Sequence, residues 1–460
     1  MTDSTYSINR RIALQLMATA GVAATSTACA NTKITKASPF KSLSNNSKPT
    51  GTRFNLQEAE RVMHELNLDA LVLGDGRNFQ QATGCQPLTT KMGRPALDLA
   101  ILIAKPEPKV MIVMAGFTYH YLAADLHSFT DNDVFLYGFG NTSELDKEEA
   151  LNSFLFSDRG EQPIRDVEKN RITTSKKILD RKAFQNSRDQ ALKSALKSAG
   201  ADSGRIGFDT AGVGAYLTQT LPQADLTSAD DALRRIRTVK SPIEIELMRT
   251  SSDINIKSAH AALQQIGAGA SHKDLRGAYY SELAKRGSNG VFMVIDHVSD
   301  EQYDADLAEG QTFLIDCVND NLGYLGDYGR TVFIGEPIKS AVRAQTAVSK
   351  AWEQLRDQLK PGLKFSDISA LGQKAMQEQG TTYRVSFQPH SVGVFHSDHL
   401  GDGSSGRRED IVLRPGMIIS VDCPVLETGF GGSVHLEDLM LITNDGAEPI
   451  HDLGTSTIVI

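Results

Sequence analysis

Two aspartates in the segment 313–331, FLIDCVNDNLGYLGDYGRT, have the types and spacing to do chemistry together. An apolar run leads into Asp316, turn-forming residues follow at 319–323, and a second run ends at Asp327, 11 positions after Asp316. Because Asn, Asp and Gly favour turns, this segment predicts a β-hairpin. The spacing allows the paired strands to bring both carboxylates to one side of one site.

Neighbouring carboxylates repel each other and favour a cation between them. Hard divalent ions take oxygen ligands, and Mn, Fe, Co or Zn accept imidazole as well. A histidine and two further acids lie at the ends of β-like runs downstream, which completes the set Asp316, Asp327, His390, Asp422 and Glu437. We therefore predict two divalent metal ions per chain (Mn, Co, Zn or Fe), about 3.5 to 4 Å apart, with a shared water that becomes hydroxide.

In this order, the five residues resemble the ligand set Asp, Asp, His, Glu, Glu of the pita-bread metallopeptidases. This family includes methionine aminopeptidase, Xaa-Pro aminopeptidase, prolidase and creatinase. Its second Asp precedes an Arg-Thr pair, as Asp327 precedes Arg330 and Thr331. The resemblance implies an α/β (α+β) chain, with an N-terminal creatinase-like α/β domain followed by a C-terminal pita-bread catalytic domain.

Two positions depart from the family pattern. Asp422 stands where the family usually has Glu, one methylene longer, and Glu427 is a candidate substitute. The common Arg-Ile-Glu-Asp reads His435, Leu436, Glu437, Asp438, so a frequent substrate-facing Arg is absent. Both changes are compatible with metal binding and leave the peptide specificity open.

Other histidines are candidates for substrate contact. His396 resembles the family's second His, which contacts the scissile carbonyl or the tetrahedral oxyanion, and His399 is its rival. His297 is either the family's first, substrate-side His or an ordinary loop residue. His435, two residues before the last ligand, is predicted to bind substrate.

The resemblance implies a dinuclear metallo-exopeptidase, similar to Xaa-Pro aminopeptidase or prolidase, that cleaves an amide bond with a metal-bridging hydroxide. Asp422 or Glu437 would relay protons to the leaving nitrogen, so Asp422 is predicted to be catalytic as well as a ligand. Two alternatives remain open: a non-peptidase C–N amidohydrolase like creatinase, and a catalytically inactive binding protein of this fold. The expected partner is a small peptide or small amide, and the resemblance implies a homodimer.

Composition sets the broad class. The chain has 460 residues, 40% of them hydrophobic and 23% charged, with a net charge of −8. This balance predicts a soluble globular protein of about two domains, and the lack of a basic block argues against nucleic acid as a partner. The four predicted segments are a signal peptide (1–30), a flexible linker (31–53), an N-terminal domain (54–236) and the catalytic domain (237–460).

The first 30 residues predict an export signal of the Tat type. Arg10 and Arg11 precede a short apolar run, and Ala28 and Ala30 flank Cys29 as an Ala-x-Ala cleavage site. The apolar run is too short to span a bilayer, so no transmembrane segment is expected. The predicted location is periplasmic, with a lipid anchor on Cys29 as the alternative. Three cysteines then remain, which predicts buried thiols and no disulfide framework.

Local patterns also predict secondary structure. Ser241, Pro242 and Glu244 form a capping box that begins the helix leading into the catalytic domain. The other expected elements are strands at 70–73, 97–104, 109–115 and 291–296, and helices at 273–286, 338–360 and 365–379.

Overall fold

The computed structural model describes residues 51–86, 88–93, 97–122, 133–138, 166–181, 184–296, 298–399, 409–426 and 432–460. The predicted signal peptide, with Cys29, lies outside these residues, as do His297 and Glu427. The last residues of the predicted flexible linker, 51–53, are packed against the rest of the chain. Arg53 is 4% exposed and donates hydrogen bonds to the carbonyls of Leu322 (2.5 Å) and Gly84 (3.0 Å).

The N-terminal part is built on one seven-stranded sheet with the order β5-β4-β3-β2-β1-β6-β7. Strand β2 runs antiparallel to β1 and β3, and the remaining pairs are parallel. The strands are β1 (Ala70–Leu73), β2 (Leu99–Ile103), β3 (Lys109–Ala115), β4 (Val134–Tyr137), β5 (Phe184–Gln185), β6 (Arg205–Phe208) and β7 (Asp225–Ser228). Every residue of β1 and β2 is buried, as expected for apolar runs in the middle of a covered sheet.

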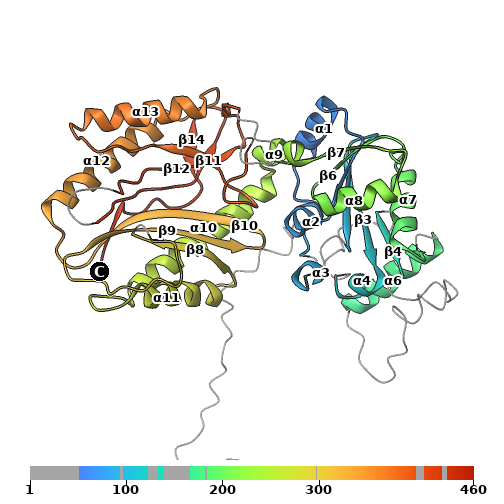
Figure 1. Ribbon diagram of the computed structural model, residues 1–460, viewed down its shortest axis with the longest axis horizontal. Coiled ribbons are helices and arrows are strands. Elements are labelled where there is room, and N and C mark those ends of the chain that lie inside the picture. The colour runs from blue at the N-terminus through green and yellow to red at the C-terminus, as the bar shows by residue number, and fades with distance from the viewer. Residues whose placement is uncertain are drawn as a thin grey trace, which may run out of the picture. The chain divides into compact units, whose positions relative to one another are not determined.

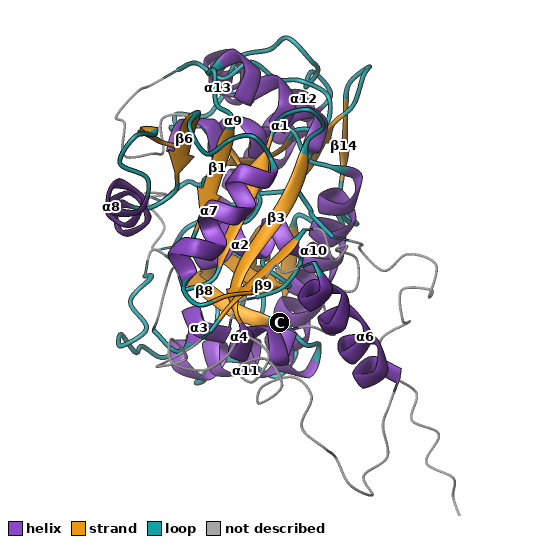
Figure 2. Cartoon of the chain, turned by 90° about the vertical axis from the view of Figure 1, so that its right-hand side faces the viewer, coloured by secondary structure: helices purple, strands orange, loops and turns teal. Residues whose placement is uncertain are grey.

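Helices cover this sheet, and α7 packs on β3 and β4 (Figure 2). The helices of this part are α1 (Leu56–Glu65), α2 (Gly76–Thr83), α3 (Leu88–Lys91), α4 (Gly116–Leu122), α6 (Asp166–Asp180), α7 (Arg188–Ser198), α8 (Ala211–Thr220) and α9 (Asp230–Thr238). Their apolar faces and the strands form one continuous core.

Helix α10 (Pro242–Leu263) starts at the predicted capping box. The Ser241 hydroxyl accepts from the Glu244 amide (3.3 Å), and the Glu244 carboxylate accepts from the Ser241 amide (2.8 Å). Leu247 and Ile254 lie in the cores beneath this helix. The sequence prediction for this start of a helix is therefore confirmed.

The C-terminal part contains two four-stranded sheets, with the orders β15-β10-β9-β8 and β11-β12-β13-β14. Helices α10 and α11 pack on the first sheet and helices α12 and α13 on the second, each pair with its own apolar core (Figure 1). The elements are α11 (His272–Lys285), β8 (Asn289–Ile295), β9 (Thr312–Asn321), β10 (Tyr324–Phe333), α12 (Lys339–Arg356), α13 (Phe365–Glu378), β11 (Gln388–Ser391), β12 (Ile418–Asp422), β13 (Met440–Ile442), β14 (Ala447–Pro449) and β15 (Thr457–Val459). The predicted mixed α/β fold is confirmed.

The predicted hairpin is β9 and β10, but its turn is shorter than expected. The strands continue to the pair Asn321 and Tyr324, so only Leu322 and Gly323 form the loop. Both have positive φ (54° and 86°), the conformation of a type I′ turn, whose twist suits a two-residue hairpin. The Asp320 carboxylate accepts from the Gly323 amide at 2.8 Å and holds the turn closed.

Among the described residues, no helix is long and apolar enough to cross a membrane. Cys85, Cys317 and Cys423 are buried, and within this part of the chain they form no disulfide bond, as predicted.

Candidate metal centre

The hairpin register brings Asp316 and Asp327 to one face of the sheet. Asp316 pairs with Gly329, and Asp327 pairs with Val318, so the two aspartates are diagonal neighbours across the ladder. Diagonal side chains on one face lie close enough to share a ligand. Asp327 is fully buried, and Asp316 is partly buried.

The second sheet supplies His390 and Asp422 by the same geometry. His390 pairs with Ser420 in the β11-β12 ladder, and Gln388 pairs with Asp422, so His390 and Asp422 are also diagonal neighbours. The His390 Nε2 atom lies 3.4 Å from the Asp422 carboxylate. Asp422 retains 31% side-chain exposure and is therefore open to solvent on one side.

Glu437 joins the two sheets. Its backbone exchanges hydrogen bonds with Gly329 of β10 (3.1 and 3.3 Å), in an isolated antiparallel bridge. Its buried carboxylate lies 3.3 Å from His390 Nε2 and accepts a 2.6 Å hydrogen bond from the Ser420 hydroxyl. The structure therefore brings together all five residues that the sequence predicts as metal ligands.

Among the residues that the structure describes, three groups of side chains each offer ligand atoms within 4.8 Å of one another. They are Asp327, His390 and His396; Asp316, His435 and Glu437; and His390, Asp422 and Glu437. The groups share members and so form one cluster with four carboxylates. Two divalent cations would balance the four negative charges of that cluster.

The protonation of the cluster reflects this excess of negative charge. Burial and the charges of Glu437 and Asp327 raise the pKa of Asp316 well above its usual value. Burial and the charge of Glu437 likewise raise the pKa of Asp327, to about 6, against the opposing effect of His396. Burial alone would raise the pKa of Glu437, but hydrogen bonds with His390 and His435 hold it well below normal.

Burial acts on the pKa of the imidazoles in the opposite sense. Burial would lower the pKa of His390, His396 and His435, but the adjacent carboxylates raise it, to about 9 for His396 and His435. A site that draws protons onto three imidazoles is a site that attracts positive charge. Metal ions would supply that charge at the same place.

Further details fit a metal site. The Nδ1 atom of His390 lies 3.0 Å from the carbonyl of His396, and donating its hydrogen there would leave the lone pair of Nε2 free for a metal ion among the carboxylates. Asp316 Oδ1 and Asp327 Oδ1 are buried and have no hydrogen-bond partner among the described residues. Buried carboxylate oxygens normally have partners, so these atoms are well suited to bind cations.

The remaining predicted histidines occupy different places. His396 lies at the cluster, with Nε2 3.3 Å from Asp327 Oδ2 and a side chain that is 36% exposed. His399 packs its ring edge-on against Phe365, with ring centroids 5.1 Å apart, and belongs to none of the three groups. His435 is 2% exposed and lies inside the cluster, where its Nε2 atom is 3.1 Å from Glu437 Oε2.

Several supporting residues were missed by sequence reasoning. Arg330 is fully buried and donates to the carbonyls of Gly329 (2.7 Å) and Glu437 (2.9 Å) and to the Asp438 carboxylate (2.7 Å). Trp352 Nε1 donates to the other oxygen of Asp438 at 3.1 Å. This network fixes the backbone that carries Glu437. The Arg-Thr pair after Asp327 and the acid after Glu437 were visible signals, but their partners are distant in sequence.

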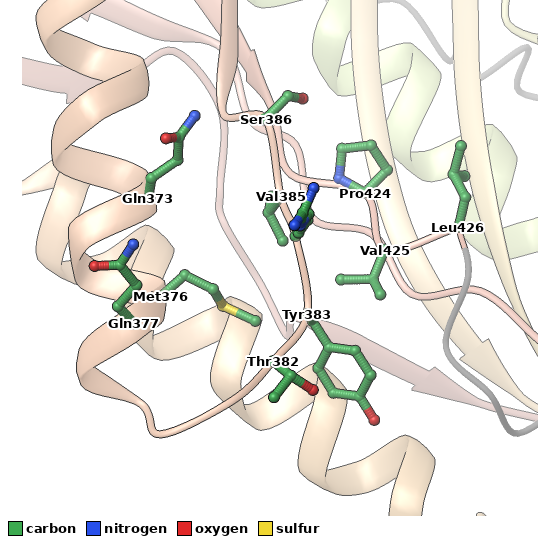
Figure 3. A pocket seen from close by; sticks show the side chains of 11 residues that line it. Gln373, Met376, Gln377, Thr382, Tyr383, Val385, Ser386, Pro424, Val425 and Leu426 are labelled. Carbon is green, nitrogen blue, oxygen red and sulfur yellow. The ribbon is translucent and has the colours of Figure 1, made fainter.

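A groove of about 1040 Å³ lies elsewhere on the C-terminal part (Figure 3). It is bordered by the end of α13, by residues 382–386 and by Pro424, Val425 and Leu426, which follow the Asp422 strand. None of the predicted ligands lines it. The chemistry is therefore assigned to the carboxylate cluster and not to this groove.

Comparison with known proteins finds one family to which part of the chain is similar. Residues 246–444 match metallopeptidase family M24. The chain is 27% identical over 257 residues to a protein named "Probable dipeptidase PepE" from Mycobacterium tuberculosis, which covers 52% of this chain and 67% of that protein. It is 24% identical over 228 residues to an Xaa-Pro dipeptidase from Pyrococcus furiosus, which covers 48% of this chain and 64% of that protein.

Solved structures show the same fold over most of the chain. The prolidase from Pyrococcus horikoshii OT3 aligns with a TM-score of 0.58 and 17% identity, covering 86% of this chain and 97% of that structure. An Xaa-Pro dipeptidase from Bacillus anthracis aligns with a TM-score of 0.61 and 17% identity, covering 88% and 99%. The likeness extends beyond residues 246–444, so the N-terminal part shares the architecture too.

Proposed function

We propose that this chain, whose residues 246–444 match metallopeptidase family M24, is a dinuclear exopeptidase that acts on dipeptides or Xaa-Pro peptides. The observation that carries the proposal is the buried cluster of four carboxylates and its histidines, with carboxylate oxygens that have no other partner among the described residues. The similarity to proteins named dipeptidase and Xaa-Pro dipeptidase supports the substrate class.

The residues that would hold two divalent cations are Asp316, Asp327, His390, Asp422 and Glu437. Their oxygen and imidazole atoms are a donor set that Mn, Co, Fe and Zn accept. When bound, such ions supply Lewis acidity, which polarises a carbonyl and lowers the pKa of a water molecule. Because this charge also neutralises the carboxylates, the loaded site is expected to be more stable than the empty one.

His396 and Asp422 are the side chains suited to move or hold protons during hydrolysis. His396 Nε2 faces the cluster and is partly exposed, so it can donate a hydrogen bond to the carbonyl oxygen as negative charge develops there. Asp422 is more exposed than Asp327 and Glu437. A proton held on Asp422 Oδ1 or Oδ2 can therefore reach the leaving nitrogen.

The shorter acid at Asp422 favours a second candidate, a C–N amidohydrolase that does not cleave peptides. An aspartate at this position reaches one methylene less far than a glutamate, which leaves more room beside the carboxylate. A substrate panel separates the two candidates. Xaa-Pro dipeptides and other dipeptides are compared with small amides and guanidino compounds, at equal concentration and with the same metal.

The first experiment measures metal content of the purified protein by elemental analysis, followed by the substrate panel. About two transition-metal ions per chain and hydrolysis of dipeptides are expected. Asp327→Asn, which keeps the shape of the side chain and removes its charge, should lose both. Arg249→Gln, which removes a charge from an exposed ion pair with Glu448, should lose neither. A chain that binds no metal after supplementation with Mn, Co, Fe and Zn contradicts the proposal.

We also propose that the protein is exported to the periplasm, on the strength of the twin-arginine signal at Arg10 and Arg11. Cell fractionation is the test. Replacement of both arginines by lysine should keep the full-length chain in the cytoplasm, and unchanged export would contradict a Tat signal.

A further inference from the structure

We propose that His435 is a metal ligand, so that one of the two cation positions is held by Asp316, His435 and Glu437. The inference deepens the proposed function and rests on its metal centre. It assigns to His435 a role different from the substrate contact expected from the sequence. It also gives each of the two ions an imidazole ligand, His390 for one and His435 for the other.

The polar contacts of the His435 ring all point toward the carboxylates of the cluster. His435 Nε2 lies 3.1 Å from Glu437 Oε2 and 3.9 Å from Asp422 Oδ1. A ligand atom of His435 also lies within 4.8 Å of ligand atoms of both Asp316 and Glu437. The other ring nitrogen, Nδ1, has no hydrogen-bond partner among the described residues. All polar contacts of the ring within that part of the chain are therefore on the side of the carboxylates.

A substrate cannot easily reach the buried ring of His435. His435 is 2% exposed, whereas the His396 side chain is 36% exposed. A side chain that binds substrate needs a face open to it, and His396 has one. An imidazole buried among carboxylates is better placed to bind an ion that sits between them.

The His435 imidazole occupies the space that a side chain at position 329 would otherwise fill. Gly329 lies in β10 between Asp327 and Arg330, directly across from Glu437. A Cβ atom on Gly329 would lie 2.2 Å from Cδ2 and 2.3 Å from Nε2 of His435. The hairpin that carries both aspartates therefore leaves out one side chain at the point where the His435 ring lies.

The chemical consequence is a change in ion preference. Carboxylate-rich sites suit Mn and Mg, and each added imidazole favours Zn, Co, Ni or Fe. A centre with one imidazole per ion should therefore prefer Zn or Co over Mn at both positions. The carboxylate of Asp422 lies between the two rings, 3.4 Å from His390 Nε2 and 3.9 Å from His435 Nε2, and is placed to contact either ion.

The test measures ion binding directly. Metal-free protein, prepared by chelation and dialysis, is titrated with Co²⁺ and Zn²⁺, and X-ray absorption of the Zn-loaded protein counts imidazole ligands per ion. With both positions loaded in excess Zn²⁺, wild type should give about one imidazole per ion, and His435→Asn about half of one. The variant should bind the weaker ion at least about 100-fold less tightly, since loss of an outer-shell partner alone costs 10- to 100-fold.

His272→Asn is the matched control. His272 is also a buried histidine (4% exposed) whose Nδ1 has no hydrogen-bond partner among the described residues, but it lies at the start of α11 and in none of the three groups. It should leave the Kd for both ions and the imidazole count unchanged. His396→Asn is measured in parallel, so that any imidazole contributed by His396 is recognised. If His435→Asn does not fold, the imidazole count of wild type and His396→Asn still decides between one ligand histidine and two.

Two results would overturn the inference: an imidazole count that His435→Asn does not change, or a wild-type count of about half of one. Either would make His435 an imidazolium that only pairs with Glu437. Metal binding that depends on His435 in a protein that hydrolyses no peptide would leave the inference intact and refute the proposed function. Peptide hydrolysis by a protein whose metal affinity does not depend on His435 would support the proposed function and refute the inference.

Discussion

Gly329→Ala is the substitution for which the structure allows the sharpest prediction. The new Cβ would lie 2.2 Å from the His435 ring and 2.8 Å from Glu437 Cβ. Non-bonded carbon atoms are comfortable at about 3.5 Å or more. The His435 ring and the β10 backbone at position 329 must therefore move apart by about 1.3 Å. Two movements can achieve this.

One way is to separate the backbones of Gly329 and Glu437. This would break the two hydrogen bonds of their bridge, each worth about 0.5 to 1.5 kcal/mol. Arg330, which donates to both carbonyls, opposes it. The other way is to swing the His435 ring out, which carries Nε2 from 3.1 Å to more than 4 Å from Glu437. Because the backbone is clamped, we expect the ring to move.

The expected cost is that of overpacking a tight interior, about 1 to 3 kcal/mol. For a part of the chain of roughly 220 residues, this lowers the Tm of the metal-free protein by roughly 2 to 12 °C. In addition, the displaced ring should weaken binding of one ion by at least about 10-fold. Calorimetry of the metal-free protein and titration with Co²⁺ measure the two effects separately.

The control is Gly277→Ala, because Gly277 is exposed on α11 and an added Cβ meets nothing within 4 Å. Alanine is the better helix former, so this variant should gain about 0.5 to 1 kcal/mol and keep its ion affinity. The reasoning is refuted if Gly329→Ala melts like wild type and binds both ions as tightly. It is also refuted if both glycine variants shift the Tm in the same direction.

Three further predictions concern the metal, a buried ion pair and pH. Chelation of the loaded protein should abolish hydrolysis and lower its Tm, because the ions bind only the folded site, and Co²⁺ should restore both; full activity after chelation would contradict this. Arg237→Ala removes the partner of the buried Asp398 at 2.8 Å and leaves it only Arg234 at 3.9 Å, so it should cost up to about 3 to 5 kcal/mol in urea unfolding, against less than about 1 kcal/mol for Arg249→Ala in a more exposed pair. Burial lowers the pKa of His451, so below about pH 6.5 the unfolded chain binds a proton at His451 that the folded chain does not. The contribution of His451 to the unfolding free energy of the metal-free protein should therefore fall as the pH is lowered through 6.5, by up to about 1.4 kcal/mol per pH unit. It is measured as the difference between the pH profiles of wild type and His451→Asn, and identical profiles would contradict this.

The hairpin shows how far local sequence rules reach. The spacing along the predicted hairpin allowed Asp316 and Asp327 to share a face without proving it, and the observed register places them on one face. The turn was predicted too early because Asn319 and Asp320 are turn formers. In the structure the Asn319 side chain is fully buried, donates to the carbonyl of Ser251 (3.2 Å) and accepts from the Gly326 amide (3.1 Å). These tertiary contacts satisfy its polar atoms and let the strand continue to Asn321.

The position of His435 shows where such rules stop. In an extended segment, residues two apart point to the same side, so the sequence could place His435 near Glu437. It could not show whether the ring faces the substrate or lies among the carboxylates. That depends on the space left by Gly329, more than 100 residues earlier, and a glycine between two polar residues of a strand gives no local sign of what fills its place.

The arrangement of the ligands implies that metal loading and folding are coupled. Asp316 and Asp327 belong to the first sheet, His390 and Asp422 to the second, and Glu437 bridges them. Without cations, the carboxylates repel one another across the contact between the sheets, and burial together with that repulsion raises the pKa of Asp316 and Asp327. Each ion would draw ligands from both sheets and so cross-link them. The contact between the sheets is therefore unfavourable in the empty site and would be stabilised when ions bind. The stability of the C-terminal part should then depend on whether its metal centre is loaded.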